Sequence, residues 1–408
     1  MRTYKNALAL INILFCAVLA AQDLSQPPDQ KSKDPFPYQV QSDNRVTFQL
    51  KAPQAISVAV QGDWPGGLGG NSTTPMVKDE KGIWSVTVGP LQSDSWHFTF
   101  AVDGVTFTPP AVLGPQTTNI LPLPPGDFVI PGPYGDDFAP HDVQHGTVAD
   151  PYVPFLGLKK HIVVYTPSGY YEDPAKRYPV LYITNIPAVL EGQTNLHFLL
   201  DNLIASGRMK PMIVVVMDPN GPGGNSVGWA SFQGAGNQTG PMLVKASQAI
   251  ADEIVPWVDK AFRTIPDRDH RAIAGFSSEG STGFMTGANN PDKFSTIGAF
   301  SGGFPTWPGV AVQIHSALDP SQYIGPDLNR VPDMTKLGAL IPKLNASANM
   351  KFVYLASGLN EPLIQTHQLM KKFLEERGIK YYSTEQPGYT HDWRFVRWCL
   401  RDFLPRIF

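Results

Sequence analysis

Three compact apolar runs after residue 150 constrain the fold of this chain most strongly. They are HIVVYTPSGY, YPVLYIT and MIVVVMDP. A short apolar run without alternation is typical of a strand that is buried on both faces. Amphipathic segments such as NLHFLLDNLIASG lie between and after these runs. Strands that alternate with helices predict a parallel, doubly covered α/β sheet in residues 151–408.

The preceding part of the chain has a different pattern. The segments RVTFQLKAP, ISVAVQGDW, GIWSVTVGP and SWHFTFAVDGVTF alternate apolar and polar residues and are bounded by turn-forming residues. In the last segment Trp96, Phe98 and Phe100 share one face. Residues 38–122 are therefore predicted to form a small antiparallel β-sandwich. The Pro- and Gly-rich residues 123–150 that follow are predicted to be a linker.

The N-terminus resembles a targeting segment. Arg2 and Lys5 precede a short apolar run, and small residues follow it. Residues 1–21 are predicted to be a signal peptide, because the apolar run is short for a bilayer span. The alternative is an uncleaved membrane anchor. Residues 22–37 are polar and proline-rich, which predicts a flexible spacer. The mature chain is expected to be secreted or periplasmic.

Composition and charge narrow the partners. The chain has 42% hydrophobic and 16% charged residues and a formal net charge of −3, without a basic cluster. These values favour a soluble globular protein that binds neither nucleic acid nor, after signal cleavage, a membrane. The mature chain would keep one cysteine, Cys399, which is predicted to be a buried structural thiol. There is no H-E-x-x-H motif, and no metal or other cofactor is predicted.

Ser277 is the candidate nucleophile. The segment RAIAGFSSEGST reads as a strand that runs into a turn of small residues. It nearly matches the nucleophile elbow G-x-S-x-G, but Glu279 stands in place of the second glycine and Gly280 follows it. Taken alone, this signal is weak and favours an ordinary turn serine, because serine is common in strand-to-helix turns. A hydrolase also needs an acid and a histidine later in the chain.

Three histidines follow Ser277. His367 lies in an amphipathic segment that ends at Gly378, so it is expected to be an ordinary helix histidine, on the surface or in the core. His315 has no supporting pattern. His391 follows a predicted strand and loop and precedes the closing helix, where a loop can present an imidazole to the elbow. His391 is therefore the candidate base.

Glu361 is the candidate acid. It lies just past the strand-like run KFVYLASG. Its carboxylate could hold the imidazole of His391 in one tautomer. The alternative is that Glu361 only begins the next helix, where the helix dipole favours an acid. The order of Ser277, Glu361 and His391, each at the end of a predicted strand, favours a catalytic triad.

These motifs resemble the esterase D group of carbohydrate esterase family 1, which includes feruloyl and acetylxylan esterases and has enterochelin esterases as relatives. The matching phrases include DNLIASGRMKPMIVVVMDPNG, EIVPWVDKAFRTIPDRDHRAIAGFS and TEQPGYTHDWRFVRWCLRDFLPRIF. The resemblance implies an α/β-hydrolase domain with Ser277, Glu361 and His391 as its triad. Residues 38–122 are similar to an immunoglobulin-like module related to carbohydrate-binding module family 48.

Two positions depart from the family pattern. Glu279 replaces a glycine of the elbow and, if its carboxylate pointed inward, would oppose a developing oxyanion. The family tends to have a His-Gly pair where this chain has Asn185 and Ile186, and Pro187 after them has no N–H to donate. The expected oxyanion donors are therefore Ser278 and Ile186 through their backbone N–H groups, or Asn185 through its side chain.

Tryptophans of the first domain could bind sugar rings. Trp84 and Trp96 lie in alternating strands and are expected to be core residues. Trp64 lies in the turn GDWPGG and is the candidate for an exposed carbohydrate-binding platform.

The leading hypothesis is a secreted serine esterase that acts on a polysaccharide or phenolic ester. A second hypothesis is a catalytically impaired homologue that binds glycan or another ligand, because both departures concern oxyanion stabilisation. A third makes the first domain a carbohydrate-binding module with an inert passenger.

Overall fold

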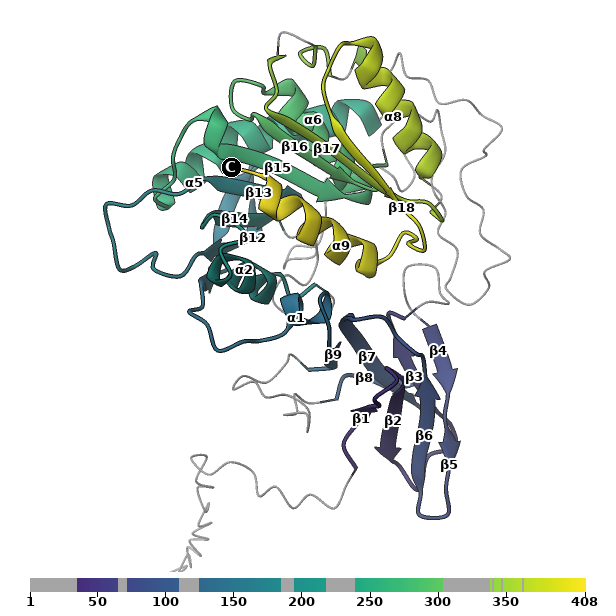
Figure 1. The fold of residues 1–408 in the computed structure, drawn as a ribbon. Coiled ribbons are helices and arrows are strands. Elements are labelled where there is room, and N and C mark those ends of the chain that lie inside the picture. Colours follow the sequence, from purple (N-terminus) through teal and green to yellow (C-terminus); the bar gives the residue numbers. More distant parts are fainter. Residues whose placement is uncertain are drawn as a thin grey trace, which may run out of the picture. The chain divides into compact units, whose positions relative to one another are not determined.

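A computed structural model describes residues 35–64, 72–109, 125–184, 194–217, 239–303, 338–339, 341–345, 348–361 and 363–408. Phe36–Phe408 forms one compact unit, drawn as a ribbon in Figure 1. The predicted signal peptide and nearly all of the predicted spacer lie outside the described residues, so both stay predictions. Within the described part of the chain, no helix is long and apolar enough to cross a membrane.

Two antiparallel sheets form the N-terminal part of this unit, as the alternating segments predicted. The described strands follow the order β1-β2-β6-β5 in one sheet, and β4-β3-β7-β8 with β9 beside β7 in the other. The bounds in the first sheet are β1 Tyr38–Val40, β2 Val46–Lys51, β5 Val77–Lys78 and β6 Ile83–Val88. Those in the second are β3 Val58–Gly62, β4 Ser72–Pro75, β7 Asp94–Val102, β8 Val105–Phe107 and β9 Asp127–Ile130. The arrangement is a β-sandwich, consistent with an immunoglobulin-like module.

Aromatic side chains fill the core of the sandwich. Trp84 and Trp96 are buried there, as predicted from their strands. Trp64 is also buried, with 4% of its surface exposed, and its ring stacks on Phe48 at a centroid distance of 5.2 Å. The ring lies against Gly62, where an added Cβ would fall 1.8 Å from it. The prediction of an exposed platform at Trp64 is therefore wrong, because the indole covers the end of the sandwich core.

The predicted linker carries regular structure that belongs to both neighbouring parts. β9 pairs with β7 of the sandwich, and β10 (Thr147–Ala149) pairs with a strand of the following sheet. A short helix, α1 (Gly135–Phe138), lies between them. The Pro and Gly residues flank these short elements, so composition excluded a long helix but not edge strands. A sandwich fragment that ended at residue 122 would lack β9.

A mostly parallel sheet forms the C-terminal part, as the compact apolar runs predicted. Its described strands follow the order β10-β12-β14-β13-β15-β16-β17-β18, with β11 beside β12. β10, β11 and β12 run antiparallel to their neighbours, and β13 through β18 run parallel to one another. The remaining bounds are β11 Tyr152–Phe155, β12 Leu158–Thr166, β13 Val180–Thr184, β14 Ile213–Met217, β15 Arg271–Phe276, β16 Thr296–Phe300, β17 Phe352–Gly358 and β18 Tyr382–Gln386.

Helices cover both faces of this sheet (Figure 1). One face packs against α2 (Leu196–Ala205) and α9 (Trp393–Phe403). The other packs against helices that include α4 Thr239–Ala249, the π-helical turn Ile250–Ile254, α5 Val255–Ala261, α6 Ser277–Asn289 and α8 Ile364–Glu376. Short 3₁₀ turns span Arg268–His270 and Leu404–Arg406. Cys399 on α9 is fully buried, and burial raises the pKa of its thiol, as expected for a structural cysteine.

Candidate active site

Ser277 lies at a sharp junction between a strand and a helix. β15 occupies an inner position of the sheet, between β13 and β16, and α6 begins at Ser277 itself. The backbone φ of Ser277 is 59°, in the left-handed region that residues with a side chain seldom adopt. A strained strand-to-helix turn of this kind presents a nucleophile above the sheet. The backbone thus has the conformation of an elbow despite the altered motif.

Glycines 275 and 280 allow the chain to close this turn. A Cβ at Gly275 would lie 2.5 Å from the carbonyl oxygen of Glu279, and one at Gly280 would lie 3.0 Å from the oxygen of Gly275. Thr184, the last residue of β13, donates its hydroxyl to the Glu279 carbonyl at 2.6 Å. Helix α6 therefore packs closely against β13 and β15 without a glycine at position 279.

Glu279 is buried beside the elbow, with 6% of its surface exposed. Burial raises the pKa of its carboxyl group, and a hydrogen bond with Thr282 opposes that shift only in part. Among the described residues, Glu279 Oε1 has no hydrogen-bond partner. Burial therefore shifts Glu279 toward its neutral carboxyl form relative to an exposed glutamate.

His391 reaches the elbow from a turn between β18 and α9. Its Nε2 lies 2.8 Å from Ser277 Oγ. The imidazole stacks on Phe276, with ring centroids 4.5 Å apart and planes at 25°. Asp392 follows directly and caps α9, because its side chain accepts a hydrogen bond from the backbone N–H of Phe395. The start of α9 thus fixes the chain on one side of His391.

Glu361 holds the other nitrogen of the imidazole. It follows the end of β17, and its Oε2 lies 3.0 Å from His391 Nδ1. The Glu361 side chain is fully buried, whereas 22% of the His391 side chain is exposed. Ser357, on β17, donates its hydroxyl to Glu361 Oε1. Helix α8 begins three residues after Glu361, at Ile364, so the carboxylate contacts the histidine and not the first turn of that helix.

Of the other two histidines that follow Ser277, the structure describes His367 and not His315. His367 on α8 is 3% exposed, and its Nε2 lies 2.9 Å from Ser383 Oγ. Burial lowers the pKa of His367 to about 4, so its imidazole is neutral at pH 7. His367 is thus the ordinary helix histidine that its sequence neighbourhood predicted, on the core side. His315 lies outside the described residues.

The predicted oxyanion donors are described only in part. Asn185 and Ile186 lie outside the described residues, so their role stays a prediction. Ser278 is the second residue of α6, and the N–H groups of a helix's first turn have no acceptor within the helix. Its backbone N–H is therefore available in principle to a negative oxygen at the helix N-terminus.

Phe276 and Ser357 were missed from the sequence. Each lies near a predicted site residue along the chain: Phe276 directly precedes Ser277, and Ser357 precedes Glu361 by four positions. An aromatic residue before the nucleophile and a hydroxyl before the acid are too common to be diagnostic. Only the folded geometry shows that one ring stacks on the imidazole and that the hydroxyl donates to the carboxylate.

The Esterase family model matches residues 155–396, more than half of the chain. The chain belongs to the Esterase family. This membership assigns the matched region, which contains Ser277, Glu361 and His391, to the carboxylic ester hydrolases. It confirms the family that the sequence phrases predicted.

Two relatives of this chain have endo-1,4-beta-xylanase in their names. The chain is 31% identical over 286 residues to an endo-1,4-beta-xylanase/feruloyl esterase of Xylanibacter ruminicola, a match that covers 65% of this chain and 36% of that protein. It is 26% identical over 264 residues to endo-1,4-beta-xylanase Y of Acetivibrio thermocellus, covering 61% and 22%. The chain thus spans at most 36% of the length of these relatives.

Solved structures support the same fold. The enterobactin esterase of Shigella flexneri is similar with a TM-score of 0.59 at 14% identity, over 92% of this chain and 96% of that one. A CE1 ferulic acid esterase of Anaeromyces mucronatus is similar with a TM-score of 0.51 at 18% identity, over 68% and 96%. These similarities confirm the predicted α/β-hydrolase esterase fold.

Proposed function

We propose that this chain is a serine esterase whose nucleophile is Ser277, whose general base is His391 and whose orienting acid is Glu361. One observation carries the proposal. The imidazole of His391 lies 2.8 Å from Ser277 Oγ on one side and 3.0 Å from Glu361 Oε2 on the other. Both distances are within hydrogen-bond reach, which is the geometric requirement for activation of a serine by an oriented base.

The acylation step follows from this arrangement. Because Glu361 is a buried acceptor at Nδ1, it favours the tautomer in which Nδ1 carries the proton and Nε2 is free to accept. Nε2 takes the Ser277 proton as Oγ attacks the ester carbonyl, and the imidazolium is stabilised by the Glu361 carboxylate. The imidazolium then gives that proton to the leaving alcohol, and the acyl group remains on Oγ.

Deacylation repeats the sequence with water. His391 takes a proton from water, the hydroxide attacks the acyl-enzyme carbonyl, and the proton returns to Ser277 Oγ as the acid leaves. The backbone N–H of Ser278, at the start of α6, is the described donor for the tetrahedral oxyanion. A neutral Glu279 would not oppose that negative oxygen, and the raised pKa of its carboxyl group supports activity despite the altered elbow.

We propose a phenolic ester on a plant polysaccharide as the substrate. The names of the relatives in Xylanibacter ruminicola and Acetivibrio thermocellus support this class, since both refer to xylanases and one to a feruloyl esterase. The N-terminal segment supports export of the mature protein, which such a polymeric substrate requires. Fractionation of expressing cells and mass determination of the mature N-terminus would test export.

Hydrolysis assays test the activity and its substrate class together. Purified protein is given methyl ferulate, p-nitrophenyl acetate and feruloylated xylan, and Ser277→Ala is assayed in parallel. The proposal predicts turnover of the simple aryl ester and of methyl ferulate by the wild type only. Turnover of p-nitrophenyl acetate without methyl ferulate would keep the esterase and reject the phenolic substrate. Absence of all turnover would reject the enzyme.

A ligand-binding protein that has lost catalysis is the alternative. The substitution at position 279 favours it, because a carboxyl group has replaced the glycine beside the oxyanion site. In that case the wild type and Ser277→Ala would bind ferulic acid or xylan oligosaccharides equally and neither would hydrolyse an ester. Equilibrium binding on the same two proteins separates this alternative from the esterase.

A further inference from the structure

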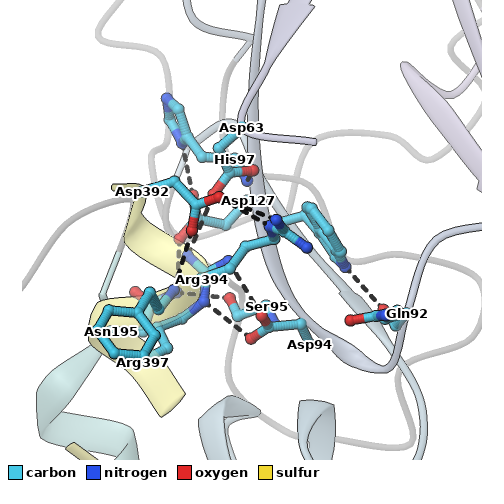
Figure 2. A network of polar contacts seen from close by, with 12 residues as sticks. Asp63, Gln92, Asp94, Ser95, His97, Asp127, Asn195, Asp392, Arg394 and Arg397 are labelled. Carbon is cyan, nitrogen blue, oxygen red and sulfur yellow. Dashed lines mark hydrogen bonds and ion pairs between the residues drawn. The ribbon is translucent and has the colours of Figure 1, made fainter. Parts of the chain in front are cut away.

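A buried ionic cluster joins the sandwich to helix α9, the helix that begins two residues after His391. Figure 2 shows its members, with Arg397 on α9 and Asp63 and Asp94 from the sandwich. Arg397 Nε and Nη2 lie 2.8 and 3.2 Å from the two carboxylate oxygens of Asp94, and Nη1 lies 3.1 Å from Asp63 Oδ2. Only 1% of the Arg397 side chain is exposed. The guanidinium therefore binds two strands of the sandwich with its full planar fork.

Burial and ion pairing oppose one another in this cluster. Burial raises the pKa of Asp94 and raises that of Asp63 to about 6, although the Arg397 guanidinium offsets both shifts in part. Burial alone lowers the pKa of Arg397, but the carboxylates of Asp94 and Asp63 reverse that effect and raise it, so Arg397 stays charged. Asp63 also accepts the backbone N–H of His97 at 2.8 Å, which fixes its orientation. A buried charge that loses its partner is strongly destabilising. The pairing of Arg397 with Asp63 and Asp94 thus favours a single placement of the first turns of α9 against the sandwich.

The same end of α9 is bonded to both neighbours of His391. Asp392 Oδ2 accepts hydrogen bonds from Thr390 Oγ1 and from Arg394 Nη2, each at 2.9 Å. Asp392 Oδ1 accepts the N–H of Phe395 at 3.0 Å. Arg397 lies one helical turn after Trp393, the first residue of α9. Movement of α9 would therefore carry the residues on each side of the imidazole with it.

A second buried contact holds the other helix on this face of the sheet. Asn195, the N-cap residue directly before α2, is fully buried and has a left-handed φ of 42°. Its Nδ2 donates to Asp127 Oδ2 at 2.7 Å and to Ser95 Oγ at 3.1 Å, and Asp127 Oδ1 lies 2.6 Å from His97 Nδ1 (Figure 2). The sandwich thus contacts both α2 and α9, which pack together in one apolar core.

We propose that the sandwich is a positioning element of the esterase site, because the contacts of Arg397 with Asp63 and Asp94 fix the start of α9 and, through it, the imidazole of His391. This inference rests on the proposed function. It makes Arg397 a positioning residue, which acts on the reaction only through His391. A sandwich that served only as an attached binding module would not alter the rate at which a small ester is hydrolysed, which distinguishes that role from the one proposed.

Arg397→Lys in the full-length protein tests the inference, with Arg401→Lys as the matched control. Lysine keeps the charge but cannot span two carboxylates with a fork. Arg401 lies one turn further along α9 and pairs instead with Asp137 of α1. For p-nitrophenyl acetate, we expect kcat to fall about 10- to 100-fold in Arg397→Lys with KM unchanged, because a misplacement near 1 Å costs rates of that order. Arg401→Lys keeps kcat within about two-fold, the result expected for an independent site.

Two readouts separate positioning from general stability. In the His391→Ala background, Arg397→Lys should cause no further loss, because its effect requires the imidazole. The ¹⁵N resonances of His391 should also shift in Arg397→Lys and keep their positions in Arg401→Lys. If Arg397→Lys does not fold, Asp94→Asn can replace it, with the same measurements of kcat and of the His391 resonances against Arg401→Lys.

Unchanged kcat in a folded Arg397→Lys protein would overturn this inference and leave the esterase proposal intact. An equal loss in Arg401→Lys would also overturn it. A wild-type protein without esterase activity would overturn both.

Discussion

Two polar clusters of this protein differ in how they are built. The Ser277, His391 and Glu361 cluster joins residues that are 114 and 30 positions apart, and its imidazole is partly exposed. The cluster of Arg397, Asp63 and Asp94 joins residues that are 303 and 334 positions apart and is almost completely buried. The first is open to solvent at His391, as a site that binds a substrate requires. The second is almost closed to solvent, so we expect it to act only through the position of the helix that carries Arg397.

The comparison separates groups that perform chemistry from groups that hold them. Removing a member of the first cluster is expected to abolish the rate and leave the fold nearly intact. Removing a member of the second is expected to change stability and, through α9, the rate as well. Buried groups that belong to neither cluster and do not contact α9 should affect stability alone.

The largest effect is expected at the base. His391→Ala removes the only described group within reach of Ser277 Oγ that can accept its proton, so kcat should fall by about a million-fold. Initial rates on p-nitrophenyl acetate measure the loss, and thermal unfolding checks the fold. A rate within ten-fold of the wild type would show that another group activates the serine.

The next effect is expected at the orienting acid. Glu361→Gln keeps the shape of the side chain but can present a donor to Nδ1, which favours the wrong tautomer, so kcat should fall by about ten thousand-fold. Glu385→Gln, on the neighbouring strand β18, is the matched control and should stay within about two-fold of the wild type. Equal rates in the two variants would remove Glu361 from the site.

His367 tests the class of buried groups that affect stability alone. Its pKa is lowered by burial from 6.5 to about 4, so the folded protein binds fewer protons than the unfolded chain between these values. The stability that the buried neutral imidazole contributes is fully present above pH 6.5 and is lost as the pH falls to about 4. The free energy of unfolding changes by about 3 kcal/mol over this range. The free energy of unfolding of His367→Gln should fall less with acid than that of the wild type, and its kcat at pH 7.5 should be unchanged. Urea unfolding between pH 4 and 7.5 measures this free energy.

His270→Gln, at a histidine whose side chain is 43% exposed, is the control for that measurement. If the free energy of unfolding of His367→Gln fell with acid as steeply as in the wild type and in His270→Gln, the buried imidazole would not be the cause. A loss of kcat in His367→Gln would place His367 with the groups that support the site.

The smallest effect is expected at Glu279. Burial raises the pKa of the Glu279 carboxyl group, and Glu279→Gln keeps the shape of the neutral form that this shift favours, so we expect kcat to stay within about two-fold. Glu279→Gly should instead lower the free energy of unfolding by about 1 kcal/mol through helix propensity alone. A rise of ten-fold or more in Glu279→Gln would show that the wild-type group is charged and opposes the oxyanion.

The sequence allowed the first cluster to be predicted and not the second. Ser277 and Glu361 each follow a strand with its own apolar pattern, His391 follows a predicted strand and loop, and the order of the three residues along the chain is diagnostic. Asp63 and Asp94 lie at strand ends, where acids usually face solvent. Arg397 lies in a helix whose pattern does not indicate a buried charge. Such pairs depend on how two distant parts of the chain pack, which no local period encodes.

The same limit explains the errors in the sandwich and linker. The turn around Trp64 suggested exposure, but the indole fills the end of a core that forms only when both sheets pack. The composition of residues 123–150 suggested an irregular connection, whereas β9 and β10 obtain their hydrogen bonds from strands elsewhere in the chain. In each case the deciding partner is distant in sequence.

Mapping of a fluorophosphonate adduct tests the central claim most directly. The wild type, Ser277→Ala and Glu361→Gln are treated with the probe, digested and analysed by mass spectrometry. The account predicts a single adduct on Ser277 in the wild type, none in Ser277→Ala, and much slower labelling of Glu361→Gln. An adduct that persisted in Ser277→Ala, with Ser278 as the first alternative, or no adduct in the folded wild type, would contradict the assignment of Ser277 as the nucleophile.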